Sequence, residues 1–109
     1  MARIRMEVVD GNLALVTIDN EPKRNAFSGD MARQLRRRFD EIEATPSLRC
    51  VVVTGAGDKA FSSGHDVAQM REHPGETAAP EVNSAFHRPT SMRKPVIAAV
   101  TGAAYAAGF

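Results

Sequence analysis

The sequence predicts an α/β fold, because strand-like and helix-like patterns of apolar residues alternate along it with turn residues between them. Two β-prone runs, at 5–9 and 13–18, are separated by Asp10-Gly11-Asn12, and Asp-Gly readily supplies the positive φ angles of a tight hairpin turn. A helical pattern follows, and after it comes a continuous apolar run at 49–54. A helix that leads into such a strand is typical of a β-α-β crossover in a parallel sheet.

The first helix is expected at about Gly29–Glu43. Ser28 can cap its N-terminus, and Asp30 stands in the first turn, where the free N–H groups favour a negative charge. Apolar residues recur at spacings of four, four and three, at Met31, Leu35, Phe39 and Ile42. One face of this helix should therefore pack on the sheet.

The remaining segments are less regular. The runs at 49–54 and 95–100 are expected to be strands buried on both faces, because their apolar residues do not alternate with polar ones. Segments 19–25 and 55–59 have the turn residues of loops, and 72–80 is the best candidate for a mobile loop. A helix could span 81–92, although Pro89 should interrupt it.

Composition restricts the classes of function. The 109 residues allow one domain, and 14 basic against 13 acidic residues leave a formal charge of +1, too little to steer nucleic acid or an anionic membrane. The basic run at 33–38 is typical of a solvated helix face. No apolar stretch is long enough for a signal peptide or a membrane span. The single cysteine, Cys50, adjoins an apolar run, so a buried, inert thiol and a cytoplasmic location are expected.

One arrangement occurs twice and points to a binding site. The apolar run at 51–53 precedes Ser62-Ser63-Gly64, and the run at 96–100 precedes a stretch at 102–108 that is Gly and Ala except for Tyr105. In parallel α/β folds, ligands bind at the carboxyl ends of strands, where backbone N–H groups in turns are free to bind an anion or oxyanion. Small residues let the ligand approach the backbone, although tight helix–strand packing explains them equally well. A site with two N–H donors is therefore plausible.

Three segments then resemble successive signatures of the crotonase superfamily, the enoyl-CoA hydratase/isomerase family, at the family's spacing. They are Asn25-Ala26-Phe27 after Pro22-Lys23-Arg24, the segment AFSSGHD at 60–66, and KPVIAAVTG at 94–102. The resemblance covers almost the whole chain. It implies an incomplete crotonase-like β-β-α spiral fold, in which residues 1–109 form the N-terminal part of the domain.

The resemblance also implies a mechanism. The carbonyl of an acyl-CoA thioester would lie between two backbone N–H donors that stabilise an enolate oxyanion, the first from His65 and the second from Ala107. Ala106-Ala107-Gly108 replaces the family's consecutive glycines, which keeps the N–H but reduces the space above it. Coenzyme A is part of the substrate, so no separate cofactor is expected. Residues expected to contact substrate or CoA are Lys23, Arg24, Ala26, Ala60, Ser62, Gly64, His65, Asp66, Val67, Ala68 and Ala107.

Several of these residues have alternative interpretations. The His65 imidazole could titrate near neutral pH, but the motif uses its backbone. Asp66 resembles a general base, yet at the start of a helix its carboxylate more often caps free N–H groups. Lys23 and Arg24 suit phosphate but are also typical of a solvated surface. His73 and His87 lack partners at a metal-ligand spacing, and no metal site is expected.

The family's catalytic glutamates have no counterpart in these 109 residues, since the first would follow Phe109. Three readings therefore stay open: an enoyl-CoA hydratase or isomerase of fatty acid metabolism whose activity depends on further sequence, a non-catalytic acyl-CoA binding or interaction module, and an inactive gene fragment. Full-length family members form homotrimers or hexamers. The resemblance implies the same assembly for a full-length form of this chain.

Overall fold

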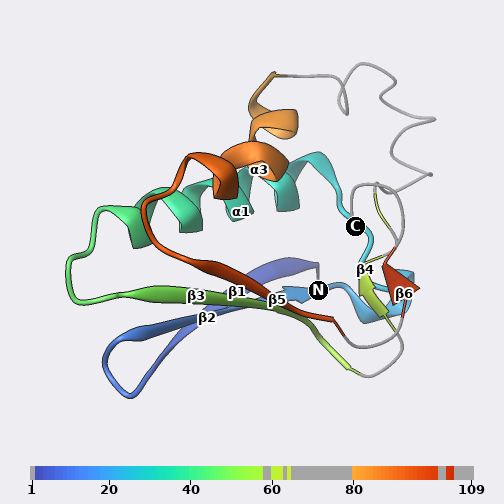
Figure 1. Cartoon of the computed structure of the whole chain (residues 1–109). Helices are drawn as coiled ribbons and strands as arrows, with labels where there is room; N and C mark the ends of the chain where they lie inside the picture. The colour runs from blue at the N-terminus through green and yellow to red at the C-terminus, as the bar shows by residue number, and fades with distance from the viewer. Residues whose placement is uncertain (1, 58–59, 63, 65–79, 101–102, 105–109) are drawn as a thin grey trace.

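A computed structural model of the chain describes residues 2–57, 60–62, 64, 80–100 and 103–104 (Figure 1). Its main sheet has four strands in the order β1-β2-β3-β5, and two helices, α1 and α3, lie over one face of it (Figure 1). Strand β1 is antiparallel to β2, whereas β2, β3 and β5 run parallel to one another. The predicted α/β fold and its parallel crossover are therefore confirmed. The strands span Arg3–Val9 (β1), Leu13–Asp19 (β2), Cys50–Gly55 (β3) and Val96–Ala99 (β5).

Two very short strands lie beside the main sheet. Strand β4 (Ala60–Ser62) pairs in parallel with β6 (Ala103–Ala104), although 40 residues lie between them in the sequence (Figure 1). A 3₁₀-helix, η1 (Glu21–Lys23), follows β2, within the segment that the sequence predicted as a loop. Pro22 begins that turn favourably, because its fixed φ suits the first positions of a helix.

The predicted hairpin and its turn are confirmed. Val9 pairs with Leu13, and Asp10 and Gly11 at the centre of the turn have φ angles of 53° and 76°. The Asn12 N–H closes the turn on the Val9 carbonyl at 3.3 Å. Strand β1 also begins two residues earlier than the apolar pattern indicated.

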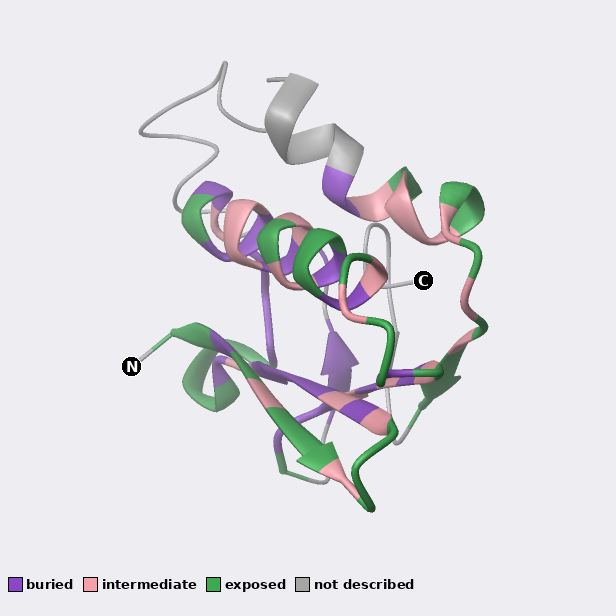
Figure 2. Ribbon diagram, turned by 90° about the vertical axis from the view of Figure 1, so that its left-hand side faces the viewer, coloured by how far each residue is buried: buried purple, intermediate pink, exposed green. Residues whose placement is uncertain are grey.

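Helix α1 spans Gly29–Glu43, as predicted. The Ser28 side chain accepts a hydrogen bond from the Met31 N–H at 3.1 Å, which satisfies one of the free donors at the helix start. The buried face of α1 is turned toward the sheet, and its outer face is exposed or half-buried (Figure 2). This face includes all four residues of the predicted apolar stripe: Met31, Leu35, Phe39 and Ile42.

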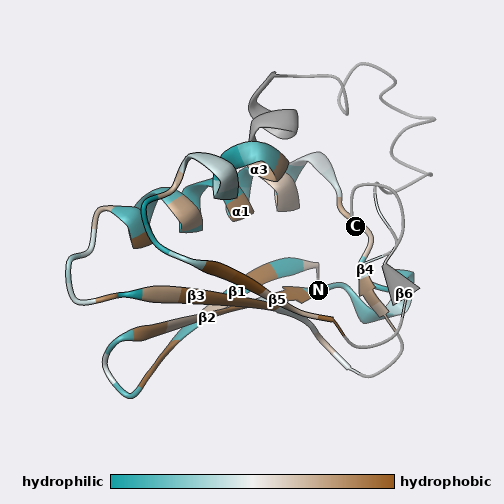
Figure 3. Cartoon of the chain, in the orientation of Figure 1, coloured by the Kyte–Doolittle hydropathy of each residue, from teal (hydrophilic) through white to brown (hydrophobic). Residues whose placement is uncertain are grey.

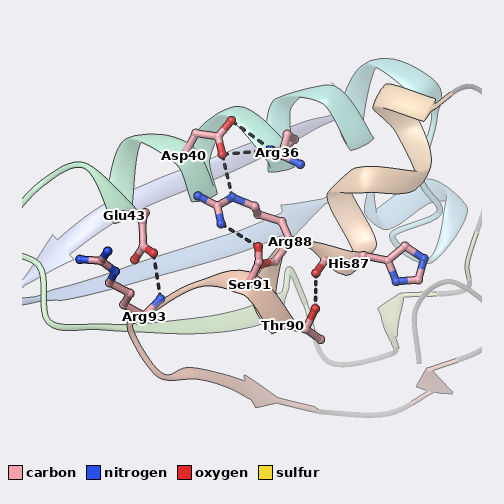
Figure 4. A network of polar contacts seen from close by, with 8 residues as sticks. All are labelled: Arg36, Asp40, Glu43, His87, Arg88, Thr90, Ser91 and Arg93. Carbon is pink, nitrogen blue, oxygen red and sulfur yellow. Dashed lines mark hydrogen bonds and ion pairs between the residues drawn. The ribbon is translucent and has the colours of Figure 1, made fainter.

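Helix α3 (Pro80–Ser91) packs along α1, and a network of polar contacts joins the two helices (Figure 4). Asp40 accepts hydrogen bonds from Arg36 at 3.0 Å and from Arg88 at 2.9 Å. Partial burial would raise the pKa of Asp40, but the hydrogen bonds and positive charges of Arg88 and Arg36 outweigh it and hold that pKa below its usual value. Pro89 does not interrupt the helix, because it stands close to the C-terminus, where one lost N–H matters little.

Lys94, the first residue of the segment at 94–102, has a structural role at the end of α1. Its ammonium group donates to the carbonyls of Ile42 and Thr45, just where α1 ends. A positive charge and three N–H donors at this end of a helix satisfy carbonyls that have no partner within the helix. Lys94 therefore ties the entrance of β5 to the end of α1.

Burial of the strands differs from the prediction, since the helices cover only one face of the sheet. In β3 buried residues alternate with half-buried ones, and Val52 lies on the uncovered face. Cys50 shares that face and is half-buried, so the prediction of a buried thiol was wrong. Strand β5 was also predicted to be buried, yet it lies at the edge of the sheet with Ile97 55% exposed, and it is apolar along its length (Figure 3).

Some sequence predictions fall outside the part of the chain that the structure describes. These are the loop at 72–79 and the segment 65–71 before it; Pro80, the last residue of the predicted loop, begins α3. Within the described ranges, neither helix is long and apolar enough to cross a membrane.

Candidate functional site

A pocket of about 270 Å³ opens between the turn after β2 and the segment that joins β3 to β4. It combines a carboxylate and a guanidinium with small apolar side chains. Of the residues predicted to contact CoA, Arg24 and Ala60 line it, whereas Lys23 is exposed on η1 and does not. The complete lining is Glu21, Pro22, Arg24, Asn25, Ala56, Gly57 and Ala60.

Two consecutive left-handed residues shape the first wall of this pocket. Arg24 and Asn25 have φ angles of 53° and 59°. Asparagine tolerates this conformation well, but arginine does so at a cost, so the surrounding contacts must hold it. The Arg24 N–H donates to the Glu21 carbonyl at 2.9 Å, and the Asn25 N–H donates to the Asn20 carbonyl at 2.8 Å.

The Asn25 side chain joins this wall to the opposite one. Its amide nitrogen donates to the carbonyls of Ala56 at 3.0 Å and Ala60 at 2.7 Å, and its amide oxygen accepts from the Asn20 N–H at 2.9 Å. Asn25 is 1% exposed. Asn20, Ala56 and Ala60 are themselves buried, and a buried backbone group left without a partner costs more than a typical hydrogen bond contributes.

Gly55 allows the same close approach from the end of β3. A Cβ at this position would lie 2.5 Å from the Phe61 carbonyl oxygen and 2.6 Å from that of Ala60. Both contacts are with backbone, which cannot rotate away as a side chain could. Glycine is therefore required for β4 to lie against the end of β3.

Ser62 continues the polar contacts toward the end of β4. It is completely buried, and its hydroxyl donates to the Asn25 carbonyl at 2.8 Å while it accepts from the Gly64 N–H at 3.1 Å. The Gly64 carbonyl in turn accepts from the Phe27 N–H at 2.6 Å. Gly64 has a φ of 94°, where residues with a Cβ are rarely found. The Gly64 N–H is thus held by Ser62 of β4, and its carbonyl by Phe27 in the segment before α1.

The pairing of β4 with β6 brings two distant segments together. Ser62 pairs with Ala104 in the parallel ladder. His65 and Ala107 each follow one of these paired residues by three positions. Both lie outside the described residues, as do Asp66, Val67 and Ala68, so the structure does not test their predicted roles.

The other candidates occupy structural or surface positions. Ala26 is buried, and its carbonyl accepts from the Asn20 side chain at 3.0 Å. His87 is exposed on α3 (Figure 4). Among the residues with a described placement, no three His, Cys, Asp or Glu side chains come together as metal ligands.

Sequence reasoning missed the connecting roles of Asn25, Gly55 and Ser62. Asn25 and Ser62 belong to two of the segments that resemble the crotonase signatures. Asparagine in a turn also tolerates a left-handed backbone, which was a usable signal at Asn25. Gly55 carried no such signal, because the contact it permits is with residues that only the tertiary fold brings near.

The family model for enoyl-CoA hydratase/isomerase matches residues 9–109 of the chain. The chain therefore belongs to the enoyl-CoA hydratase/isomerase family, within the crotonase superfamily, and its α/β fold is a partial crotonase fold.

Curated relatives agree with this assignment. A Mycobacterium tuberculosis protein named probable enoyl-CoA hydratase EchA14 is 40% identical over 103 residues, which cover 92% of this chain and 40% of that protein. The short-chain-enoyl-CoA hydratase of Clostridium acetobutylicum is 35% identical over 102 residues, which cover 91% of this chain and 39% of the relative. The chain spans about two fifths of the length of these relatives.

Solved structures share the fold. An enoyl-CoA hydratase/carnithine racemase from Magnetospirillum magneticum superposes with a TM-score of 0.86 at 31% identity, over 99% of this chain and 42% of that one. Pseudomonas aeruginosa OdaA superposes with a TM-score of 0.82 at 34% identity, over 93% of this chain and 40% of the neighbour.

Proposed function

We propose that this chain binds the thioester of an acyl-CoA and stabilises the enolate oxyanion that develops on its carbonyl. The donors are the backbone N–H groups of His65 and Ala107. In a family enzyme, this stabilisation would serve the hydration or isomerisation of an enoyl-CoA.

The observation that carries the proposal is the parallel pairing of β4 with β6. Ser62 and Ala104 are partners in the ladder, and the proposed donors follow them at the same offset of three residues. Adjacent parallel strands deliver the chain to the same edge of a sheet, which is where α/β folds bind ligands. Ser62 and Ala104 lie side by side in the ladder, so donors that follow them at the same offset can approach one carbonyl oxygen from two sides.

The neighbouring pocket supports CoA as the carrier of the acyl group. Its 270 Å³ suits a part of CoA, because whole drug-sized ligands usually occupy about 300–1,000 Å³. Arg24 is exposed at its wall and can bind phosphate through a planar fork of N–H donors. Ala56 and Ala60 supply small apolar surface beside it.

The proposed donors would contribute to the transition state more than to binding. Removal of one oxyanion-hole donor typically costs about 3–4 kcal/mol, because the donors are already oriented when charge develops on the oxygen. Proton transfer needs a separate acid or base. The residues here therefore supply electrostatic stabilisation, and acid–base groups would complete a hydration or isomerisation.

The proposal is tested by infrared difference spectroscopy with butyryl-CoA labelled with ¹³C at the thioester carbonyl. Hydrogen bonding to that oxygen weakens the C=O bond, so the labelled band should move to lower frequency when the ligand binds. Free butyryl-CoA at the same concentration provides the reference. A bound ligand whose carbonyl band stays at the free position would contradict the proposal.

The assembly and location are part of the same proposal. The single cysteine favours a cytoplasmic location, and the family's usual assembly favours homotrimers or hexamers. Size-exclusion chromatography with light scattering would test the assembly.

A further inference from the structure

We propose that Ser62 is a positioning residue for the first oxyanion donor, acting through the backbone of Gly64. The inference rests on the proposed function, because it assigns the part of the fold that orients the His65 N–H. Ser62 itself would not touch the substrate.

One peptide group joins Gly64 to His65 and so links the contacts of Gly64 to the proposed donor. The Gly64 carbonyl accepts a hydrogen bond from the Phe27 N–H at 2.6 Å. A trans peptide is planar, and its N–H points opposite to its C=O. A carbonyl held by Phe27 therefore constrains the plane of the peptide group that carries the proposed donor.

The Ser62 hydroxyl fixes the other end of Gly64. It accepts from the Gly64 N–H at 3.1 Å and donates to the Asn25 carbonyl at 2.8 Å. Gly64 can adopt many backbone conformations, so a single contact at its carbonyl would leave its φ angle free. Contacts at both polar groups hold that φ at 94° and so set the plane of the following peptide.

The residues that hold Gly64 are themselves buried and fixed by further contacts. Asn25 and Ser62 are 1% and 0% exposed, and the Asn25 side chain makes three hydrogen bonds to backbone. Phe27 is 2% exposed, and its ring meets that of Phe86 edge to face, with centroids 5.1 Å apart. The contacts to Gly64 are therefore anchored to both the pocket wall and helix α3, and small rotations of Gly64 are resisted before a ligand arrives.

The test compares two ligands that differ only at the carbonyl. Butyryl-CoA carries the thioester, and S-butyl-CoA replaces its C=O with CH₂. Calorimetric titration of the unaltered chain should show a preference of roughly 5- to 100-fold for butyryl-CoA, the value of one hydrogen bond from each of the two donors. Ser62→Ala should reduce this preference to roughly two- to tenfold, the value left by the Ala107 N–H, and leave the affinity for S-butyl-CoA unchanged.

Ser28→Ala is the matched control. Ser28 also accepts a backbone N–H at 3.1 Å, but it does so at the start of α1, outside the proposed site. This variant should lose thermal stability and keep the preference between the ligands. If Ser62→Ala does not fold, Ser62→Cys, which keeps a weak donor and acceptor of similar size, should fold and show a reduced preference.

Each outcome decides the assignment. A Ser62 variant that folds and keeps the full preference overturns it, and so does one that loses affinity for both ligands equally, because that loss would show a structural role only. An unaltered chain that binds both ligands equally, or neither, would show that the proposed function itself fails, and with it the role of Ser62.

Discussion

Asn25→Ala should strongly destabilise the fold, because one small side chain satisfies three buried backbone groups. Hydrogen bonds to Asn20, Ala56 and Ala60 would be lost, each with a net value of roughly 0.5–1.5 kcal/mol. Alanine is also more strained than asparagine at a backbone φ of 59°. The expected loss is about 3–5 kcal/mol in the free energy of unfolding, against a typical total of about 5–15 kcal/mol. Urea denaturation followed by far-ultraviolet circular dichroism measures it.

Two further variants separate the causes of this loss. Asn25→Gly removes the same hydrogen bonds but adopts positive φ without strain, so it should be about 1 kcal/mol less damaging than the alanine variant. Asn12→Ala changes an exposed asparagine in the hairpin and should stay within about 0.5 kcal/mol of the unaltered chain. A loss below about 1 kcal/mol for Asn25→Ala would refute the reasoning.

Three other predictions follow from the same structure. Gly55→Ala should lower the melting temperature by the equivalent of about 1–3 kcal/mol, because its Cβ would press on the backbone oxygens of β4, and an unchanged melt would contradict this. Arg24→Gln should weaken butyryl-CoA binding about tenfold and leave butyryl-pantetheine, which lacks the nucleotide, unaffected in parallel titrations; equal losses for both ligands would count against a phosphate contact. The pKa of Asp40 is lowered in the fold, so its contribution to stability is present above the unfolded value, 3.8, and is lost as the pH falls through the folded pKa. Melting temperatures at pH 7 to 2 should therefore decline less for Asp40→Asn than for the unaltered chain, and parallel declines would contradict the ion pairs with Arg36 and Arg88.

The sequence predicted the local elements well, because each has its own signal within a few residues. Helix α1 has a cap at Ser28 and an apolar stripe, and the hairpin has Asp10-Gly11 at its turn. Strand β4 was missed, since three residues are too few for a pattern and its partner β6 lies far along the chain.

Burial was less predictable, because it depends on which faces the helices cover. Val52 and Ile97 belong to continuous apolar runs, yet neither is buried, since neither of the two described helices lies over the outer face of β3, and β5 is an edge strand of the described sheet. Apolar composition alone does not distinguish a strand covered on both faces from one covered on a single face.

The site was predicted only in part, because its contacts also depend on the tertiary fold. Of the predicted contact residues, Arg24 after η1 and Ala60 at the start of β4 line the pocket. The contacts of Asn25 and Ser62 join segments more than 30 residues apart, and no local pattern states which carbonyl a buried amide will reach. Such partners become visible only in the folded chain.

The most direct test of the proposed acyl-CoA site is a calorimetric titration of butyryl-CoA into the unaltered chain, His65→Ala and His65→Pro. Alanine keeps the backbone N–H, so its dissociation constant should stay within about twofold of the unaltered value. Proline removes that N–H, and binding should weaken by roughly tenfold. If His65→Ala abolishes binding while the circular dichroism spectrum stays intact, or if His65→Pro binds as tightly as the unaltered chain, the backbone N–H of His65 is not the donor.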